Sequence, residues 1–281
     1  MKTTPAKVNL FLEVGSLRPK DNRHEIRTLF LPVPQLTDEI TITANSLGKG
    51  LTMSLCGRKV PEGGSAAENL ATRAVRAFCG EFGLSEDFHV QLTKRIPVSA
   101  GLGGGSSDAA AVLLEMRRLT GTPVMVDDLR PLAARLGADV PFFLNPVPSL
   151  ATGIGEVLTP VEIAADYELV IVYPSCPSPV AWAYQHCQRP KNATPPPGWP
   201  FAASQLSTVE GMAQLAWNDL GFALEAKMPL LAMLRETLCQ SGALTAIVAG
   251  SGSSVFGLAR AGQGEALRAK LRETFPNLEV F

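Results

Sequence analysis

The chain has 281 residues, of which 46% are hydrophobic and 18% are charged, and its formal net charge at pH 7 is −1. This composition excludes a disordered chain, because disorder goes with low hydrophobicity and high net charge. The 25 basic residues are scattered, which argues against a nucleic-acid binder, since a polyanion requires clustered Lys and Arg. At about 150 residues per domain, the length predicts two lobes.

The sequence carries no signature of export, of a membrane span or of a structural metal. Its first residues run into an alternating strand without an apolar signal core, and no window approaches about 18 uncharged apolar residues. The cysteines (56, 79, 176, 187 and 239) form no C-x-x-C pair, and the histidines (24, 89 and 186) share no ligand-like spacing. We therefore expect a cytoplasmic protein, a monomer or weak homodimer, with neither nucleic acid nor membrane as a partner.

The first half of the chain alternates between strand and helix patterns. Apolar residues at every second position predict a strand over 5–14. Further strands are expected over 29–33, 39–43, 51–55 and 88–92. Apolar residues at helical spacing predict a helix over 69–82, an Ala- and Leu-rich helix over 108–119, and a short helix over 129–136 that ends at Gly137.

The element order restarts after Asn145-Pro146-Val147-Pro148. We expect a buried strand over 169–173, a short helix over 181–187, helices over 217–226 and 229–240, strands over 244–249 and 254–259, and a last helix over 262–273. The stretch 189–202 is too rich in proline for helix or strand and predicts an exposed loop. Mixed elements with a seam near 146–152 favour an α+β protein of two lobes, divided into residues 1–150 and 151–281.

The clearest chemical signal is the glycine-rich stretch from Pro97 to Asp108, which follows a predicted strand and precedes a predicted helix. Its glycines allow backbone angles closed to other residues and a close approach of a ligand. Free N–H groups at the helix start favour an anion, and Ser106, Ser107 and Asp108 are candidates to cap the helix, the two hydroxyls also to contact phosphate oxygens. These features predict a phosphate cradle; the alternative is a plain strand–helix connection.

Other glycine loops fit less well. The chain lacks G-x-x-x-x-G-K-[ST], and the dinucleotide fingerprint fails because Ser106 occupies its last glycine position. A second loop, Gly250-Ser251-Gly252-Ser253-Ser254, lies between two predicted strands. It is either a hairpin turn or a second wall around the same anionic ligand.

Two charged residues are candidates for acid–base chemistry. Asp139 follows a predicted helix and stands among apolar residues, including Pro141 and two phenylalanines. Lys7 lies on the first predicted strand among apolar neighbours, where a lone charge needs a partner. A Lys7–Asp139 pair would keep the carboxylate ionised and oriented, as a base acting on a phosphoryl acceptor must be. The alternatives are a turn or capping aspartate and an edge-strand lysine whose ammonium reaches solvent.

Three motifs, in order, resemble those of the GHMP kinases, the galacto-, homoserine, mevalonate and phosphomevalonate kinase superfamily. They are Pro5-Ala6-Lys7-Val8-Asn9-Leu10, the Gly101–Ser107 loop and Gly250-Ser251-Gly252-Ser253. The resemblance covers essentially the whole chain. The first motif, the loop and Leu-Gly-Ala-Asp-Val-Pro-Phe-Phe take the forms typical of the branch that phosphorylates 4-diphosphocytidyl-2-C-methyl-D-erythritol in the non-mevalonate isoprenoid pathway.

The resemblance implies a two-lobed fold, with an N-terminal β/α nucleotide-binding lobe and a C-terminal α/β-sandwich lobe. It implies ATP-dependent phosphorylation of the 2-hydroxyl of a cytidine-diphosphate-linked polyol, with Mg²⁺ neutralising the phosphates of ATP. Asp139 would take the hydroxyl proton, Lys7 would pair with it, and Asn69 would lie near the nucleotide base. The triphosphate would be held by Pro97, Val98, Ser99, Ala100, Gly101, Leu102, Gly103, Gly104, Gly105, Ser106 and Ser107.

For the second substrate, the resemblance implies contacts from Asn9, from His24 at the cytosine edge, from Tyr184 as an aromatic shelf, and from Gly250 and Ser251. The chain departs from the usual Gly-Tyr-His pattern, because it reads Asn22-Arg23-His24. We expect the planar guanidinium of Arg23 to stack on the cytosine in place of the tyrosine.

Two other functions stay open from the sequence: a different small-molecule kinase of the superfamily, such as a homoserine or mevalonate kinase, and a catalytically silent nucleotide-binding module. The Leu-Gly-Ala-Asp-Val-Pro form and His24-Glu25 argue against the former. The presence of both Lys7 and Asp139 argues against the latter, because nucleotide binding alone needs neither.

Overall fold

The computed structural model describes residues 1–57 and 68–281. The chain divides into two compact units, each assembled from separate segments. Unit 1 comprises 1–7, 32–98 and 103–146, and unit 2 comprises 8–31, 99–102 and 147–281. The change at residues 146 and 147 falls in the expected seam, but two segments of the first half belong to unit 2. The division into an N-terminal domain of residues 1–150 and a C-terminal domain of residues 151–281 therefore stays a prediction.

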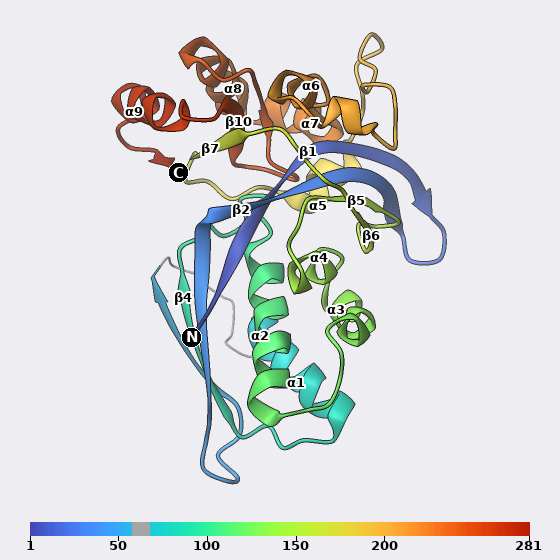
Figure 1. Ribbon diagram of the computed structural model, residues 1–281, viewed down its shortest axis with the longest axis vertical. Coiled ribbons are helices and arrows are strands. Elements are labelled where there is room, and N and C mark those ends of the chain that lie inside the picture. Colours follow the sequence, from blue (N-terminus) through green and yellow to red (C-terminus); the bar gives the residue numbers. More distant parts are fainter. Residues whose placement is uncertain (58–67) are drawn as a thin grey trace. The chain divides into compact units, whose positions relative to one another are not determined.

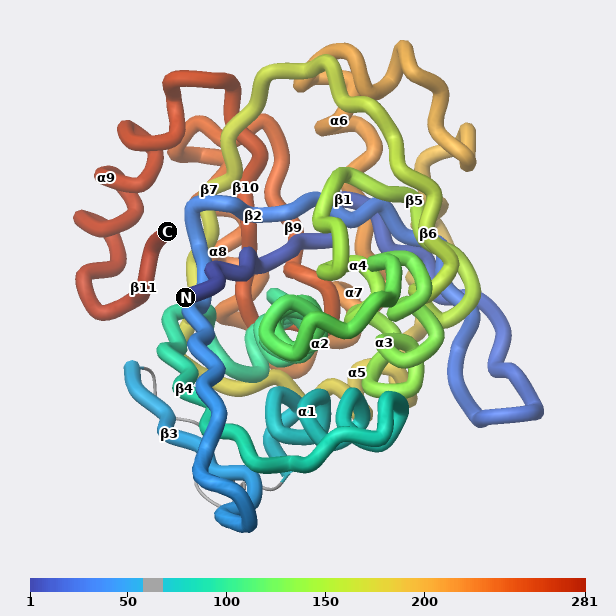
Figure 2. Tube along the Cα trace, turned by 60° about the horizontal axis from the view of Figure 1, so that its bottom comes forward, coloured from blue at the N-terminus to red at the C-terminus, as the bar shows by residue number. Residues whose placement is uncertain are grey.

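In unit 1, helices lie against one face of a sheet in which the strand order is β3 (Thr52–Gly57), β4 (Phe88–Lys94), β2 (Arg23–Ala44) and β1 (Lys2–Arg18). β4 pairs antiparallel with residues 39–44 of β2 and parallel with β3. α1 (Leu70–Phe82) and α2 (Gly104–Thr120) lie side by side against one face of these strands (Figures 1 and 2). α3 (Arg130–Leu136) and α4 (Val140–Leu144) pack on α2.

The sequence of α1 explains both its position and its ends. Asn69 accepts a hydrogen bond from the N–H of Ala71, which satisfies one of the free donors of the first turn. Gly83 ends the helix in the left-handed conformation that glycine adopts at low cost. Between them, one apolar stripe is buried: Ala71, Ala74, Val75, Phe78 and Cys79. The expected helix over 69–82 is thus confirmed almost to the residue.

β1 (Lys2–Arg18) and β2 are long strands whose residues belong partly to each unit. The sequence predicted two short strands over 29–33 and 39–43. The structure has one continuous strand there. Pro32 and Pro34 lie between the stretch paired with β5 and the stretch paired with β4, so neither removes a donor from those two ladders.

Unit 2 contains two groups of paired strands. Residues 28–30 of β2 pair with β5 (Ser149–Thr152), β5 pairs with β6 (Val157–Pro160), and β1 pairs parallel with β8 (Trp217–Asn218). A separate four-stranded antiparallel sheet has the order β11 (Glu279–Val280), β7 (Tyr167–Tyr173), β10 (Val255–Arg260) and β9 (Thr245–Val248). Of the two alternatives left open for the loop around Gly250-Ser251, the hairpin connection is present, because β9 and β10 pair across it.

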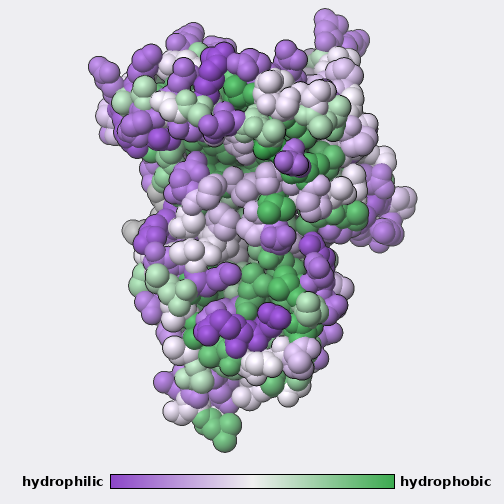
Figure 3. All heavy atoms as spheres, in the orientation of Figure 1, coloured by the Kyte–Doolittle hydropathy of each residue, from purple (hydrophilic) through white to green (hydrophobic). Residues whose placement is uncertain are grey.

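Helices cover the sheet of unit 2. α7 (Asp219–Lys227), α8 (Pro229–Ser241) and α9 (Gly264–Thr274) bury leucines at 220, 224, 231, 234, 238, 267 and 271 with Val170 and Val172 of β7. α5 (Val180–Gln185) and α6 (Val209–Gln214) complete the unit. The outer surface of α8 and α9 is mainly hydrophilic (Figure 3), in keeping with the ion pairs that Glu265 makes with Arg268 and Arg272.

Two expectations need correction. The expected helix over 217–226 begins only at Asp219, because Trp217 and Asn218 form β8 and Asn218 caps α7 by accepting from the N–H of Leu220. Residues 189–202 contain no helix or strand, as expected, but are not wholly exposed. Phe201 is buried, and Trp199 stacks on Phe11 with ring centroids 5.5 Å apart.

The sequence predicts no membrane-spanning segment. Among residues 1–57 and 68–281, no helix combines the length and the apolar character that crossing a bilayer demands.

One buried carboxylate joins several elements of unit 2. Asp219 is fully buried and accepts hydrogen bonds from the N–H of Val14 at 2.7 Å and from the indole N–H of Trp217 at 2.8 Å. Arg189 binds both carboxylate oxygens, each at 2.7 Å. Asp219 thereby ties the start of the proline-rich segment to β1 and β8 through a bidentate, charge-assisted pair.

We predict that Asp219→Ala lowers the free energy of unfolding by about 3 kcal/mol, because it leaves two donors without their acceptor and leaves the partly buried Arg189 guanidinium only its pair with Glu13. The matched control is Glu210→Ala, which removes an exposed carboxylate from its pair with Arg260 and should change stability by less than about 0.5 kcal/mol. Urea unfolding of both variants measures the difference. Equal, small effects would show that the Asp219 network contributes no more than a surface ion pair.

Candidate active site

The first turn of α2 is an uncapped helix N-terminus. Gly103 occupies the N-cap position with φ 72° and offers no side-chain hydrogen bond. The first helical bond runs from the N–H of Ser107 to the carbonyl of Gly103, at 2.9 Å. The N–H groups of Gly104, Gly105 and Ser106 have no acceptor within the helix, as in any first turn. With the partial positive charge of the helix end, they can bind an anion.

Two glycines at this turn are required by space as well as by conformation. A Cβ at Gly103 would lie 2.8 Å from Cζ of Phe143 and 3.0 Å from Cγ of Lys7. A Cβ at Gly104 would lie 2.9 Å from Cγ2 of Ile96 and 3.1 Å from Nζ of Lys94. The backbone of the loop therefore rests directly on two lysine side chains, and a larger residue at either position would have to displace a neighbouring side chain.

Lys7 and Asp139 form the expected pair. Nζ of Lys7 lies 3.3 Å from Oδ2 of Asp139; the lysine side chain is 6% exposed and the aspartate side chain 30% exposed. Asp139 is the N-cap residue of α4, but its side chain makes no capping hydrogen bond. The capping alternative for Asp139 is therefore wrong. Its carboxylate is oriented by a buried ammonium and partly open to solvent, which is the geometry that a base needs.

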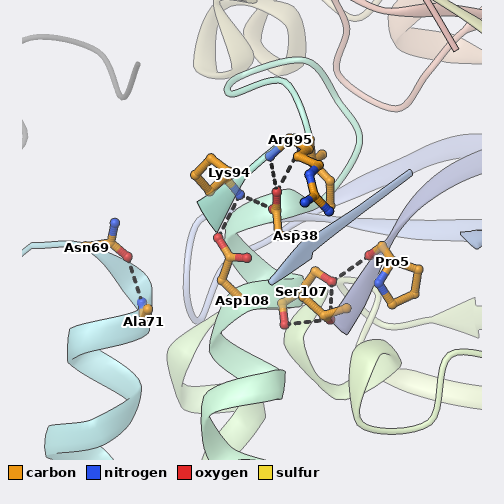
Figure 4. Close-up of polar contacts among 10 residues, drawn as sticks. Pro5, Asp38, Asn69, Ala71, Lys94, Arg95, Ser107 and Asp108 are labelled. Carbon is orange, nitrogen blue, oxygen red and sulfur yellow. Dashed lines mark hydrogen bonds and ion pairs between the residues drawn. The ribbon is translucent and has the colours of Figure 1, made fainter. Parts of the chain in front are cut away.

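Ser107 does not have the role that the sequence suggested. Its side chain is fully buried, and its hydroxyl donates to the carbonyl of Pro5 at 2.5 Å and contacts the hydroxyl of Thr4 at 2.5 Å. The hydroxyl of Thr4 also donates to the carbonyl of Ser107. Figure 4 shows Ser107 turned toward Pro5. Ser107 thus fixes α2 to β1 near Lys7, and neither its hydroxyl nor its N–H is left to contact a phosphate.

Asp108 likewise does not cap α2, because it is the fifth residue of the helix. Its Oδ2 accepts a hydrogen bond from Nζ of Lys94 at 2.7 Å, and Lys94 also donates to Asp38 (Figure 4). The three side chains are 5% or less exposed. Sequence reasoning missed this triad, although a lysine directly before a glycine-rich loop and an aspartate directly after it were visible signals.

In unit 2, residues 99–102 pack on the loop between β9 and β10. The N–H of Ser254 donates to the carbonyl of Ala100 at 3.1 Å, and a Cβ at Gly101 would lie only 1.9 Å from the carbonyl oxygen of Ala249. Asn218 holds the second loop by donating to the carbonyls of Val248 and Gly250. The two glycine-rich segments are therefore neighbours, as expected. The contacts of Gly250 and Ser251 with a ligand stay a prediction.

Two of the residues expected near the second substrate lie together in unit 2. The rings of His24 and Tyr184 are stacked, with centroids 6.0 Å apart and 24° between their planes. Nδ1 of His24 lies 3.0 Å from the carbonyl of Gly15, which only accepts hydrogen bonds, so Nδ1 carries a proton. In neutral His24, Nε2 is then a hydrogen-bond acceptor.

The other predicted contacts have mixed surroundings. Asn9 is 3% exposed and donates to the hydroxyl of Thr28 at 2.8 Å, so part of its hydrogen-bonding capacity is used inside unit 2. Asn69 serves as the cap of α1. Arg23 is exposed near the start of β2, and its backbone N–H donates to Asp21. The ligand contacts of these three residues stay predictions.

Metal-binding potential is low in the part of the chain that the structure describes. Outside residues 58–67, no group of three or more His, Cys, Asp or Glu side chains is placed to hold an ion. The sequence analysis predicts no metal site built from protein side chains, and this stays a prediction.

Comparisons with known proteins place this geometry in a family. Residues 69–145 match the GHMP kinases N terminal domain, and residues 201–277 match the GHMP kinases C terminal domain. A 4-diphosphocytidyl-2-C-methyl-D-erythritol kinase of Geobacter metallireducens is 40% identical over 257 residues, covering 90% of this chain and 87% of the relative. The kinase of that name from Anaeromyxobacter dehalogenans is 40% identical over 90% of this chain and 79% of its own length.

Solved structures agree with the sequence relatives. A crystal structure of 4-(cytidine 5'-diphospho)-2C-methyl-D-erythritol kinase superposes with a TM-score of 0.79 at 34% identity, covering 100% of this chain and 97% of that chain. A homoserine kinase from Cytophaga hutchinsonii has a TM-score of 0.73 at 18% identity, with 99% and 92% of the two chains covered. The second match supports the fold alone.

The fold and the matches define the class: this is an ATP-dependent kinase of the GHMP superfamily, with its α+β fold. Within that class, the chain belongs to the 4-diphosphocytidyl-2-C-methyl-D-erythritol kinase family. The resemblance noted in three sequence motifs is thereby confirmed over nearly the whole chain.

The Asp108 carboxyl has a measurable consequence for stability. Burial raises the pKa of Asp108 from its ordinary 3.8 to about 8; the Lys94 charge opposes this rise, and the Asp38 charge adds to it. The folded protein thus holds a proton on Asp108 up to about pH 8, whereas the unfolded chain releases it near pH 4. Between these values the folded state binds more protons, so this group makes stability fall as pH rises.

We predict that Asp108→Asn removes this part of the pH dependence. The melting temperature of the variant relative to the wild type should increase steadily from pH 5 to pH 8, as measured by thermal melts in matched buffers. Asp127→Asn, at a mostly exposed carboxylate, is the control and should show a constant difference. A constant difference for Asp108→Asn as well would mean that Asp108 is ionised in the folded protein throughout this range.

Proposed function

We propose that the protein transfers the γ-phosphoryl group of ATP to the 2-hydroxyl of 4-diphosphocytidyl-2-C-methyl-D-erythritol, a step in the formation of isoprenoid precursors outside the mevalonate route. The observation that carries the chemical part is the Lys7–Asp139 pair at 3.3 Å, beside an uncapped helix N-terminus. The substrate is supported by the family relatives, which are kinases of this compound by name.

Asp139 would act as the base. Its carboxylate accepts the proton of the substrate hydroxyl, the hydroxyl oxygen forms a bond to the γ-phosphorus, and the bond from that phosphorus to the β–γ bridging oxygen breaks to release ADP. Lys7 holds the carboxylate through its buried ammonium, and its stem packs against Gly103. The pair therefore fixes the base relative to the first turn of α2.

The triphosphate would lie on the N–H groups of Gly104, Gly105 and Ser106, where the helix end favours negative charge. Ser106 is the hydroxyl of this turn that is still partly exposed, since Ser107 is buried. Mg²⁺ bound with ATP would neutralise phosphate charge. Phosphate oxygens would be its main ligands.

The cytidyl group would be recognised in unit 2. Nε2 of neutral His24 is an acceptor, and cytosine presents its N4 amino group as a donor, whereas uracil presents an oxygen at the same place. Tyr184, stacked near His24, offers an aromatic face for the base. Arg23 is proposed to supply a second face. Arg23→Ala should then raise the KM for the cytidyl substrate about tenfold, and Arg23→Tyr should restore it.

We also propose that the enzyme acts in the cytoplasm. All five cysteines are free, as expected in a reducing compartment. A coupled ATPase assay with the cytidyl substrate, homoserine and mevalonate tests the proposed activity directly. Turnover with homoserine or mevalonate but not with the cytidyl substrate would assign the chain to another branch of the superfamily. ATP binding without turnover of any of the three substrates would indicate a silent nucleotide-binding module.

We predict that Asp139→Asn lowers kcat by about 100-fold or more, the scale of a lost general base, while the dissociation constant of a non-hydrolysable ATP analogue changes little. Lys7→Met should act in the same direction, and the double variant should lose far less than the product of the single losses, because the pair works as a unit. Asp127→Asn is the control and should retain wild-type kcat. A kcat within a few-fold of wild type in Asp139→Asn would exclude Asp139 as the base.

We predict that CDP binds at least about tenfold more tightly than UDP, and that His24→Phe abolishes this preference while keeping a ring beside Tyr184. The measurement is calorimetric titration of each nucleotide. His186→Phe is the matched control, because His186 also has Nδ1 near a carbonyl, at 2.9 Å from that of Trp182, but stacks on Trp182 instead. Equal loss of preference in both variants would point to a general effect on α5.

A further inference from the structure

The triad of Lys94, Asp38 and Asp108 connects both ends of the glycine-rich loop. Lys94 is the last residue of β4, directly before the loop, and Asp108 lies in α2, directly after it. Oδ1 of Asp38 also accepts from the N–H groups of Arg95 at 2.6 Å and Ile96 at 2.9 Å. Asp38 thus fixes the entry of the loop, and Lys94 joins Asp38 to the exit (Figure 4).

The ammonium of Lys94 lies directly against the turn that would hold the phosphates. Its Nζ is 3.1 Å from where a Cβ of Gly104 would stand. Gly104 is the first residue of α2, and its N–H is one of the free donors described above. If Lys94 shifted, the N–H groups of the first turn of α2, on which anion binding depends, would shift with it or lose their support.

The charge of the triad is balanced only when one carboxyl holds a proton. Oδ1 of Asp108 is buried and has no hydrogen-bond partner, while Asp38 accepts from three donors. Lys94 and Asp38 are the charged groups acting on Asp108. Neighbouring charges are paired elsewhere, Arg95 with Glu39 and Lys7 with Asp139. Ionisation of Asp108 would leave a net negative charge beneath the phosphate-binding turn.

Fold stability alone does not account for such a triad, because a buried ion pair is often no more stabilising than apolar residues of the same volume. We propose that Lys94, held between Asp38 and Asp108, is a positioning residue for ATP: it fixes the first turn of α2 so that its N–H groups present a preformed, electrostatically matched surface to the triphosphate. This inference rests on the proposed placement of the triphosphate at that turn.

The test is the affinity for a non-hydrolysable ATP analogue, measured by calorimetry, together with the steady-state constants for both substrates. Lys94→Met, which keeps the unbranched stem and removes the charge, should raise the dissociation constant of the analogue and the KM for ATP about tenfold or more. The KM for the second substrate should stay unchanged. Arg95→Ala is the matched control, since it removes the neighbouring exposed guanidinium but keeps the backbone N–H bonded to Asp38.

The pH dependence separates a positioning role from a merely structural one. In the wild type, the dissociation constant of the analogue should rise several-fold between pH 7 and pH 9 as Asp108 ionises. Asp108→Asn should remove this rise, because the amide cannot ionise. If Lys94→Met does not fold, the pH profiles of the wild type and of Asp108→Asn decide the question, and flat profiles in both refute the inference.

A folded Lys94→Met protein that binds the analogue with wild-type affinity would overturn the inference while leaving the proposed function intact. Failure of the wild type itself to bind the analogue would instead contradict the proposed nucleotide site, on which the inference depends. The wild-type titration therefore distinguishes the two failures.

Discussion

The close contact between the glycine backbone at the start of α2 and two lysine side chains is the constraint on which the site in unit 1 depends. Gly103 rests on the stem of Lys7, and Gly104 rests on the ammonium of Lys94. Because no Cβ separates them, the helix end, the base-orienting lysine and the buried triad form one rigid arrangement. The hydrogen bonds of Ser107 with Thr4 and Pro5 keep β1, and with it Lys7, at this distance.

This arrangement divides the work between backbone and side chains. The backbone supplies the donors for an anion, because the helix starts without a capping side chain. The side chains nearby bind other protein groups: Ser107 donates to β1, Asp108 accepts from Lys94, and Lys7 pairs with Asp139. Phosphoryl transfer demands mainly positioning and charge stabilisation from a protein, so an enzyme of this class can use most of its polar groups as supports.

The sequence predicted what is local and missed what depends on distant partners. The stripe of α1 and the alternation of β1 were legible because their periods are set by neighbouring residues. The roles of Ser107 and Asp108 were not, since their partners lie 103 and 14 residues away, and a serine after glycine reads equally well as a cap or as a phosphate ligand. α4 was missed because its five residues include a proline and leave no period to detect.

Motif order was more informative than any single residue. Lys7 and Asp139 were each ambiguous alone; their pairing was proposed from the need of a buried charge for a partner, the resemblance implied the same pair, and the 3.3 Å contact confirmed it. Arg23 shows what motif order does not give. The sequence shows plainly that Arg23 replaces the tyrosine of the family pattern, but its exposed position at the start of β2 does not show whether it stacks on a nucleotide base.

The glycine contacts also limit which substitutions in this loop could make the protein resistant to an inhibitor of the nucleotide site. Gly101 and Gly103 have positive φ, and a Cβ at Gly101 would lie 1.9 Å from a backbone oxygen, so a larger residue at either position is strained. A Cβ at Gly104 would have to displace the side chain of Ile96. Gly105 is different, since open space surrounds its would-be Cβ. Gly105 is therefore the position of these four where a side chain displaces no neighbour, and a compound that leaves room beside Gly105 would tolerate such a change.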